Sequence, residues 1–330
     1  MYLIFDTETT GLPKRWNAPI TDTNNWPRCI QIAWQLHDDM GHCLEHQDFL
    51  IRPDGFNIPY DAEKIHGIST ALATEKGEDL AVVLEKFNRA LSKAKFVVGQ
   101  NVGFDLNIMG CEYHRLQVET PLNNMPVLDT CTETTASLCQ LPGGRGGKFK
   151  LPTLTELHQF LFKTPFAEAH NATADVEATT RCFLELLRKG IFTPDELQSS
   201  PEYIQEFKAQ YPNPIVPIGL KHVNLKEATA AINAKAQKET QANQPPLYSA
   251  GIPEILKDAT VAHLHNHSQF SILQSTISIK KLVNVAAKYN MPAVALTDHG
   301  NMMGAFHFVK EIGNYNKGLK QKKLDAEAKG

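Results

Sequence analysis

The chain has 330 residues, more than one typical domain holds, so two folded units joined by a connector are expected. Hydrophobic residues make up 42% and charged residues 21%, as in a chain that buries a core, and the formal net charge is −3. A protein that coats nucleic acid through a wholly basic surface is excluded by this charge. Any contact with nucleic acid is therefore expected in one local groove.

The six cysteines are scattered and include no C-x-x-C pair. They stand in apolar or helical stretches, so buried free thiols in a reducing compartment are expected, and not disulfides or a zinc site. The first six residues read as a strand that begins at once, without a basic segment and a long apolar run, and no stretch of about eighteen apolar residues occurs. We therefore expect a cytoplasmic protein without membrane contact.

Apolar periodicity predicts a mixed α/β fold in the first part of the chain. An antiparallel meander and one later short strand are expected over residues 2–8, 29–36, 43–51 and 96–98. The spacing then becomes helical, and helices are expected over residues 80–91, 103–116, 153–163 and 173–189. Early strands with helices interleaved later indicate a mixed layered sheet and not a strict βαβ repeat.

The composition changes after Gly190. Residues 191–258 contain repeated prolines and one polar helical run, 224–239, which predicts a Pro-rich connector with one helix. We therefore expect a first domain over 1–190, this connector, and a separate C-terminal segment over 259–330. Few contacts are expected to cross the boundary at Gly190.

Two acidic residues, Asp6 and Glu8, interrupt an otherwise apolar first strand. Side chains two residues apart on a strand leave the same face, so the two carboxylates are expected side by side. Close carboxylates repel and are costly to bury unless a cation neutralises them, and hard oxygen ligands suit Mg²⁺ or Mn²⁺. A solvent-facing strand end with two hydrated acids explains the pair equally well.

Two further acids stand in the expected first turns of helices. Asp105 follows a strand and a glycine-bearing turn, and Asp175 comes five residues after His170. Asp is common at such positions because of the helix dipole, and a lone His–Asp pair is more often a cap or a surface arrangement. Alanines at 172, 174 and 178 leave room for the second helix end to approach another carboxylate.

Three segments nevertheless occur in the order of a known pattern: F-D-T-E-T-T-G at 5–11, N-V-G-F-D at 101–105 and H-N-A-T-A-D at 170–175. Together they resemble the motifs of the DEDDh exonuclease family, which includes the proofreading epsilon subunit of bacterial DNA polymerase III, ribonuclease T and oligoribonuclease. The segments I-H-G-I at 65–68 and L-D-T at 128–130 agree, so the resemblance covers about residues 1–188. One departure is Gln100, where many members have His.

The resemblance implies a ribonuclease-H-like mixed-sheet fold and 3′→5′ exonuclease activity. It implies that two cations, Mg²⁺ or Mn²⁺, lie about 4 Å apart on four ligands, Asp6, Glu8, Asp105 and Asp175. His170, with a reference pKa of about 6.5, is implied as the base that takes a proton from the attacking water. The expected product is a nucleoside 5′-monophosphate.

Substrate contacts are expected in the segment after Glu8 and in the second motif. The resemblance implies that the terminal nucleotide meets Thr9, Thr10, Gly11 and Leu12, and Phe104 is expected either against the last base or in the core. The loop over 13–28 interleaves basic residues with Trp16 and Trp26. Such a loop suits stacking of a single strand, but a loop that packs its tryptophans in the core has the same composition.

The C-terminal segment carries a second cluster of ligand-type residues. Residues 261–268 read V-A-H-L-H-N-H-S, so three alternating histidines share one face of a strand, a geometry typical of metal ligands. A helix is expected over 278–290, and a second apolar segment ends in T-D-H-G at 297–300. From Lys317 the chain reads as a polar tail.

These segments resemble the first two motifs of the PHP domain and, more closely, the start of bacterial DNA polymerase III alpha subunits. The positions that match PHP metal ligands are His265, His267, Asp298 and His299, whereas His263 stands where other members often have Asp. About 70 residues of such a domain are present, which predicts a partial (βα) barrel of two βα units.

Together the resemblances imply proofreading of DNA 3′ ends for a polymerase III alpha-type chain of which this is the N-terminal part. The expected partners are single-stranded DNA or a frayed primer 3′ end and replicative polymerase subunits, since tethering raises the local concentration of the proofreader. Two alternatives stay open: an exoribonuclease that trims RNA 3′ ends, and a non-catalytic module that only binds a polymerase.

Overall fold

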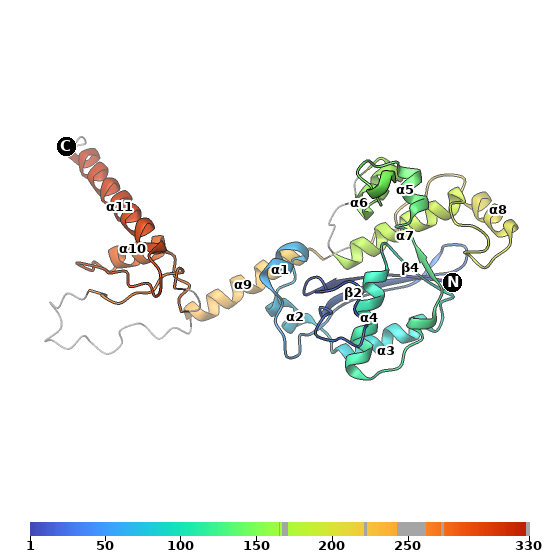
Figure 1. The fold of residues 1–330 in the computed structure, drawn as a ribbon, viewed down its shortest axis with the longest axis horizontal. Coiled ribbons are helices and arrows are strands. Elements are labelled where there is room, and N and C mark those ends of the chain that lie inside the picture. The colour runs from blue at the N-terminus through green and yellow to red at the C-terminus, as the bar shows by residue number, and fades with distance from the viewer. Residues whose placement is uncertain (165, 167–170, 221–222, 243–261, 272–273, 328–330) are drawn as a thin grey trace. The chain divides into compact units, whose positions relative to one another are not determined.

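The computed structural model describes residues 1–164, 166, 171–220, 223–242, 262–271 and 274–327. The chain forms two compact units, Met1–Asn243 and Gln244–Gly330 (Figure 1). Each unit is described by itself.

The first unit is built on a five-stranded sheet in the order β3-β2-β1-β4-β5. Its strands are β1 (Tyr2–Thr9), β2 (Cys29–His37), β3 (Cys43–Leu50), β4 (Phe96–Gly99) and β5 (Val127–Asp129). The first three strands are antiparallel neighbours, whereas β4 runs parallel to β1 and β5 parallel to β4. The predicted meander and the mixed α/β class are confirmed.

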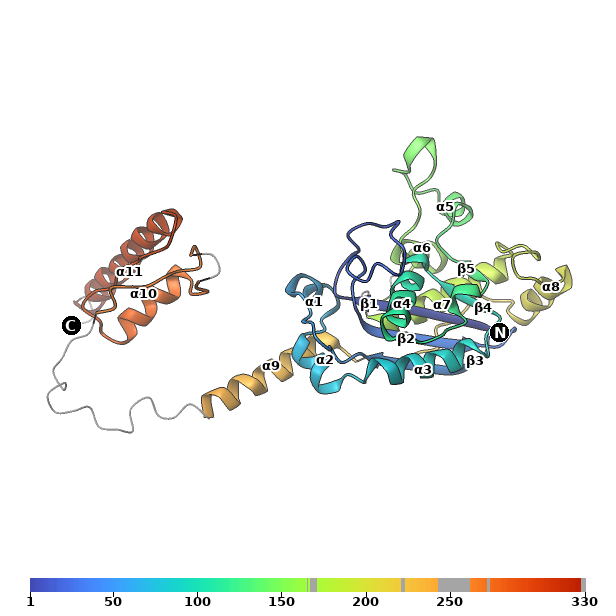
Figure 2. The same cartoon turned by 60° about the horizontal axis from the view of Figure 1, so that its bottom comes forward.

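Nine α-helices of the described residues belong to this unit. They are α1 (Tyr60–His66), α2 (Thr70–Lys76), α3 (Leu80–Leu91), α4 (Gly103–Leu116), α5 (Glu133–Cys139), α6 (Leu154–Phe162), α7 (Ala172–Lys189), α8 (Pro201–Gln210) and α9 (Leu225–Ala242). Helices α3 and α4 lie on one side of the sheet and α7 crosses the other (Figures 1 and 2). The sheet is therefore covered on both faces.

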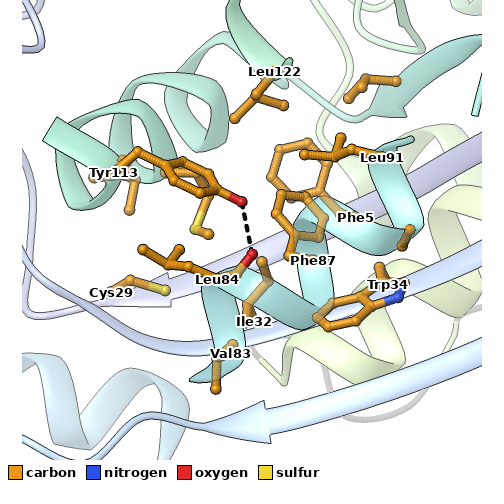
Figure 3. Close-up of a cluster of buried hydrophobic side chains, with 14 of the residues drawn as sticks. Phe5, Cys29, Ile32, Trp34, Val83, Leu84, Phe87, Leu91, Tyr113 and Leu122 are labelled. Carbon is orange, nitrogen blue, oxygen red and sulfur yellow. Dashed lines mark hydrogen bonds between the residues drawn. The ribbon is translucent and has the colours of Figure 1, made fainter. Parts of the chain in front are cut away.

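Alternation along β1 separates two cores. Leu3 and Phe5 point toward α3 and α4, where the rings of Phe5 and Phe87 lie 5.2 Å apart between their centroids. In the same cluster the Tyr113 hydroxyl donates a hydrogen bond of 3.2 Å to the carbonyl of Leu84, which joins α4 to α3 (Figure 3). A buried phenol is thereby satisfied inside an apolar cluster.

The opposite face of β1 presents Tyr2 and Ile4 to α7. Phe183 of α7 meets the Tyr2 ring edge-on at 5.0 Å, and Val176 is fully buried one turn after the start of the helix. This packing places the N-terminus of α7 over the sheet near the end of β1.

The first unit continues well past Gly190, where few contacts were expected to cross. Apolar residues of this segment are buried in the same core as α7: Phe192, Leu197, Ile204, Phe207 and Ile215. The Ile215 amide donates a hydrogen bond to the Glu185 side chain at 3.1 Å, and the Ile215 carbonyl accepts one from the Arg181 side chain at 2.8 Å. Both partners belong to α7. Among its described residues the expected one-helix connector contains two helices, α8 and α9, and Pro201 begins α8 at a position where proline is favourable.

Helix α9 is fixed to the turn between α1 and α2. Leu225 is buried against Ile68 and Leu72, and the Thr229 hydroxyl donates to the carbonyl of Gly67 at 2.7 Å. Gly67 has a positive φ of 79°, and a Cβ there would lie 2.9 Å from the backbone nitrogen of Lys226. Glycine is therefore required both for the turn and for the close approach of α9.

The second unit contains α10 (Ile279–Lys288) and α11 (Met303–Glu327). An isolated parallel bridge pairs His263 with Val294, and the Thr297 amide donates to the carbonyl of Asn266 at 2.8 Å. Two extended segments joined through α10 form the first of the expected βα units. Residues 317–327, predicted as part of a polar tail, form the C-terminal part of α11. This part of the helix has no apolar periodicity, so the sequence pattern did not indicate a helix there.

The six cysteines form no disulfide. Four are buried, as expected, while Cys131 is half-buried and Cys43 is exposed. Among the described residues, no helix combines the length and apolar character that a membrane crossing needs.

Candidate metal centre

Three carboxylates converge at the C-terminal end of β1. Asp6 and Glu8 continue the face that Tyr2 and Ile4 present to α7, and Asp175 approaches them from the first turn of that helix. One carboxylate oxygen from each of the three acids lies within 4.8 Å of the others. No other group of three or more ligand-type side chains comes this close in the part of the chain that the structure describes.

The N-terminus of α7 is fixed at this place by a cap and by small residues. The Asn171 side chain accepts a hydrogen bond from the Thr173 amide, and the Ala172 amide donates to the side chain of Gln31 in β2. The alanines at 172, 174 and 178 are buried, which lets the helix end lie close to the strands as the sequence predicted. The cap and the packing together determine where Asp175 lies.

Asp105 reaches β1 from the opposite side, where β4 no longer covers the strand. The parallel pairing of β1 with β4 ends at Ile4 and Val98. Beyond that point the Thr7 amide and hydroxyl both donate to Oδ1 of Asp105, at 2.9 and 2.6 Å. Asp105 is thus buried beside the three converging acids instead of among them.

The turn before Asp105 is held by another carboxylate. Asp129 at the end of β5 accepts hydrogen bonds from the amides of Asn101 and Val102, at 2.8 and 3.1 Å. At Gly99 a Cβ would lie 2.7 Å from the Cβ of Val102, so this turn closes only around a glycine. The strand end that the L-D-T segment predicts therefore supports the start of α4.

Burial raises the pKa of Asp6, Glu8 and Asp105, and repulsion by neighbouring acids adds to the shift in Asp6 and Glu8. Burial raises the pKa of Asp6 well above its ordinary range, and the nearby Asp105, Asp175 and Glu8 raise it further. Burial, then Asp175 and Asp105, raise the pKa of Glu8 to about 8. Burial also raises the pKa of Asp105 to about 7, although the hydrogen bonds from Thr7 oppose the shift.

The neighbouring acids thus oppose ionisation of Asp6 and Glu8. Like charges taken out of water favour protonation unless a cation neutralises them. A set of carboxylate oxygens with this spacing fits a hard divalent cation, which oxygen ligands prefer. The donor set therefore fits the metal that the sequence motifs imply.

The remaining residues of the sequence motifs have different surroundings. His170 lies outside the described residues. The Thr9 hydroxyl donates to the carbonyl of Gly11, and Thr10 accepts from the Arg28 amide, so both are engaged within the loop. Leu12 is 73% exposed.

The loop over 13–28 separates its two tryptophans. Trp26 is 3% exposed and its indole nitrogen donates to the carbonyl of Pro19, as in a core residue. Trp16 is 59% exposed, and its ring centroid lies 5.9 Å from that of Phe104. Phe104 is half-buried, so its burial lies between the two positions that the sequence allowed, the core and the surface that would meet the last base.

The ligand-type residues of the second unit are held mainly by neighbouring serines. Asp298 accepts hydrogen bonds from the side chains of Ser268 and Ser271, at 2.7 and 2.8 Å, and from the Ser268 amide. Burial tends to raise the pKa of Asp298, but these bonds prevail and lower it. The rings of His265 and His267 meet edge-on at 4.7 Å.

Sequence reasoning missed three residues that position the acids: Thr7, Asp129 and Asn171. Thr7 lies between Asp6 and Glu8, so strand alternation alone places it on the other face, where α4 begins. Asn171 precedes a helix in a typical N-cap position. Asp129 stands in a segment whose resemblance was noted but whose bonds to the turn over 101–102 could not be read from the sequence.

Acids at the end of the first strand of a mixed sheet and at a helix N-terminus suit a divalent cation and, with it, a phosphodiester substrate. Residues 3–183, more than half of the chain, match the model of the family described as Exonuclease. The chain belongs to this exonuclease family. Membership of its DEDD type implies a divalent metal, and an acidic group suited to hold one, Asp6, Glu8 and Asp175, is present.

Residues 263–322 match the PHP domain. Relatives over this region are DNA polymerase III alpha subunits: that of Chlamydia trachomatis is 62% identical over 47 residues, and that of Treponema pallidum 52% over 48 residues. Each alignment covers 14% of this chain and 4% of the relative. The chain thus spans only a small part of the length of these relatives.

Among solved structures, E. coli Exonuclease I in complex with a dA16 oligonucleotide is 21% identical, with a TM-score of 0.44. The alignment covers 62% of this chain and 42% of that one. A zinc-bound complex of E. coli ExoI with single-stranded DNA is 23% identical, with a TM-score of 0.46 and coverage of 60% and 42%.

Proposed function

We propose that the first unit is a 3′→5′ exonuclease that removes nucleoside 5′-monophosphates from DNA 3′ ends. The observation that carries the proposal is the convergence of three half-buried carboxylates, with a fourth and buried one, Asp105, beside them. In a protein of the exonuclease family, such a cluster suits hydrolysis of a phosphodiester, whose own negative charge makes cations necessary.

The proposed ligands of two ions, Mg²⁺ or Mn²⁺, are Asp6, Glu8, Asp105 and Asp175. Bound cations would neutralise the phosphate and lower the pKa of a water molecule. The chain's own residues would hold and orient these ions: β1 supplies two acids, α7 a third, and Thr7 fixes the direction of Asp105. His170 is proposed as the base that accepts the proton of the attacking water.

Thr9, Thr10, Gly11, Leu12 and Phe104 are proposed to surround the terminal nucleotide. Leu12 supports this role best, because an exposed leucine just beyond the acid cluster offers an apolar surface to a base or sugar. Thr9 and Thr10 are bonded within the loop, so we propose that they shape the pocket more than they bind the sugar.

We further propose that the chain is the N-terminal part of a DNA polymerase III alpha-type protein and proofreads for it. The similarity of the second unit to DNA polymerase III alpha subunits supports this proposal. All proposed catalytic residues lie within 1–190, and residues 191–258 and 259–330 are proposed to hold that domain's supporting segment and the PHP region.

His265, His267, Asp298 and His299 are proposed as the PHP-type ligand positions of the second unit. Because three serine donors already satisfy Asp298, we expect weak metal binding and no phosphoesterase activity from this unit. Zinc or manganese binding to a His265→Ala and His267→Ala double variant, measured against the unchanged chain, tests the assignment.

A digestion of single-stranded DNA labelled at either end tests the main proposal. With Mn²⁺, a 5′-labelled strand should shorten one nucleotide at a time, whereas a 3′-labelled strand should release labelled mononucleotide at once. Asp6→Asn should abolish both changes, while Asp61→Asn, a surface acid in α1, should retain full activity. Near-normal activity of Asp6→Asn at saturating Mg²⁺ would refute the ligand assignment.

The same digestion on matched RNA and DNA oligonucleotides separates the alternatives. Faster turnover of RNA would favour an exoribonuclease, and absence of turnover on both, with metal bound, would favour a non-catalytic module.

A further inference from the structure

One tryptophan of the first unit is placed outside the core. The chain has three, of which Trp26 and Trp34 are 3% and 0% exposed, whereas Trp16 is 59% exposed. Single exposed apolar residues are ordinary, so exposure alone says little. The surroundings of Trp16 make it informative.

The loop that carries Trp16 is held in place by many hydrogen bonds. The Arg15 amide donates to the Asn25 side chain at 2.8 Å, and that side chain donates back to the Arg15 carbonyl at 3.0 Å. Arg115 of α4 donates to the carbonyls of Thr23 and Trp26, each at 2.7 Å. A loop fixed at residues 15 and 25 and anchored by the buried Trp26 presents Trp16 in a defined position.

That position adjoins the acid cluster. Trp16 contacts Phe104, with the two rings inclined at 51°, and Phe104 directly precedes Asp105. Leu12, 73% exposed, lies four residues before Trp16 and four after Glu8. The Trp16–Phe104 ring pair thus directly precedes Asp105 through Phe104, and the exposed Leu12 lies in the chain between Glu8 and Trp16.

We propose that Trp16 stacks on a base of single-stranded DNA that lies one or two nucleotides inward from the 3′ end. This inference rests on the proposed exonuclease function. An indole can stack only on a base whose face is free, so Trp16 makes the enzyme prefer unpaired ends. Lys14 and Arg15 beside it supply positive charge for the phosphates, since the exposed pair between Arg15 and Asp22 is weak and exchangeable.

Removal of the indole should weaken binding of a strand more than it affects the chemical step. Stacking on one base contributes an amount that corresponds to about 5- to 150-fold in KM. Trp16→Ala in the full chain should therefore raise KM for a dT oligonucleotide by that factor with a smaller effect on kcat. Trp16→Phe should recover part of the loss, because a phenyl ring still stacks.

A substrate without a second base separates this inference from the proposed function. The methyl ester of thymidine 5′-monophosphate holds one nucleoside and has no second aromatic ring, so it cannot stack on Trp16. Trp16→Ala should lower the ratio of kcat/KM for the oligonucleotide to that for the ester by about 5- to 150-fold. Tyr289→Ala, an exposed aromatic of the second unit, is the matched control and should leave the ratio unchanged.

Intrinsic fluorescence gives an independent measurement. Since the other two tryptophans are buried, an oligonucleotide with a phosphorothioate 3′ end should quench the solvent-exposed part of the emission in the unchanged chain, and this quenching should be lost in Trp16→Ala.

An unchanged ratio and unchanged quenching in Trp16→Ala would overturn the inference while the exonuclease function stands. Equal loss on both substrates would also overturn it, as would a ratio that falls with RNA and not with DNA. Inactivity of the unchanged chain on both substrates would instead refute the proposed function.

Discussion

Phe207 decides whether the residues after Gly190 belong to the folded exonuclease unit. It lies in α8, beyond the boundary that the prolines suggest, yet its side chain is 0% exposed. Its ring packs with Tyr211 at 4.9 Å and with Tyr203 at 6.3 Å, in the core that α7 also lines. We therefore expect Phe207→Ala to destabilise the whole first unit.

The size of the effect follows from the burial. Truncation of a fully buried phenylalanine costs about 3–5 kcal/mol, because transfer free energy is lost and a cavity remains. With an m-value of about 3 kcal/mol/M for a unit of this size, the urea midpoint should fall by about 1–2 M. Val216→Ala in the same segment, at a 77% exposed side chain, should change stability by less than about 0.5 kcal/mol.

Tryptophan fluorescence isolates this transition, because all three tryptophans lie in the first unit. Equal midpoints for Phe207→Ala and the unchanged chain would show that α8 is a detachable connector and would refute the reasoning. By the same argument, a chain cut after Lys189 loses Phe207 and four other apolar side chains of the core that α7 lines, and it should not fold, whereas one ending at Asn243 should.

Three further predictions concern the acid cluster. In EDTA, Asp6→Asn should have a higher Tm than the unchanged chain, since it removes one of several repelling acids, and a lower or equal Tm in EDTA would contradict the repulsion. Folding raises the pKa of Glu8 from 4.5 to about 8, so between these pH values the folded protein binds a proton that the unfolded chain releases. The metal-free protein should therefore lose stability as pH rises from about 4.5 to about 8. Added Mn²⁺ should reverse the loss, and urea titrations at several pH values measure both effects. His170→Ala should lower kcat by about 10²–10⁴-fold and regain activity as pH rises, whereas an unchanged rate and pH profile would exclude His170 as the base.

Much of the fold could be predicted because periodicity is strong where elements are long and one-sided. The spacing of Leu80, Val83, Leu84, Phe87 and Leu91 predicted α3, and all five are buried. The acid cluster was also predictable in outline, since two acids on one strand face must lie together. What brought Asp175 to them is the packing of α7 across β1 and β2, which only the motif resemblance indicated.

The rest depends on contacts between distant segments. Helices α1, α2 and α5 have seven residues each, too few for a clear apolar stripe. The prolines after Gly190 predicted a connector with one helix, yet Pro201 begins a second helix, α8. The role of Thr7 could not be predicted, because the amide that donates to Asp105 is free only where β4 diverges from β1.

The route of the chain after α7 determines how a pulling force would enter the first unit. The unit's last element is α9, so tension on the following residues acts first on the attachment of α9 to the α1–α2 turn, through Leu225 and Thr229. Only after that attachment separates does load reach Val223, whose carbonyl accepts a hydrogen bond from Asn171 at the start of α7. A force applied to the chain beyond α9 therefore does not act on the start of α7, which carries Asp175, until α9 has separated.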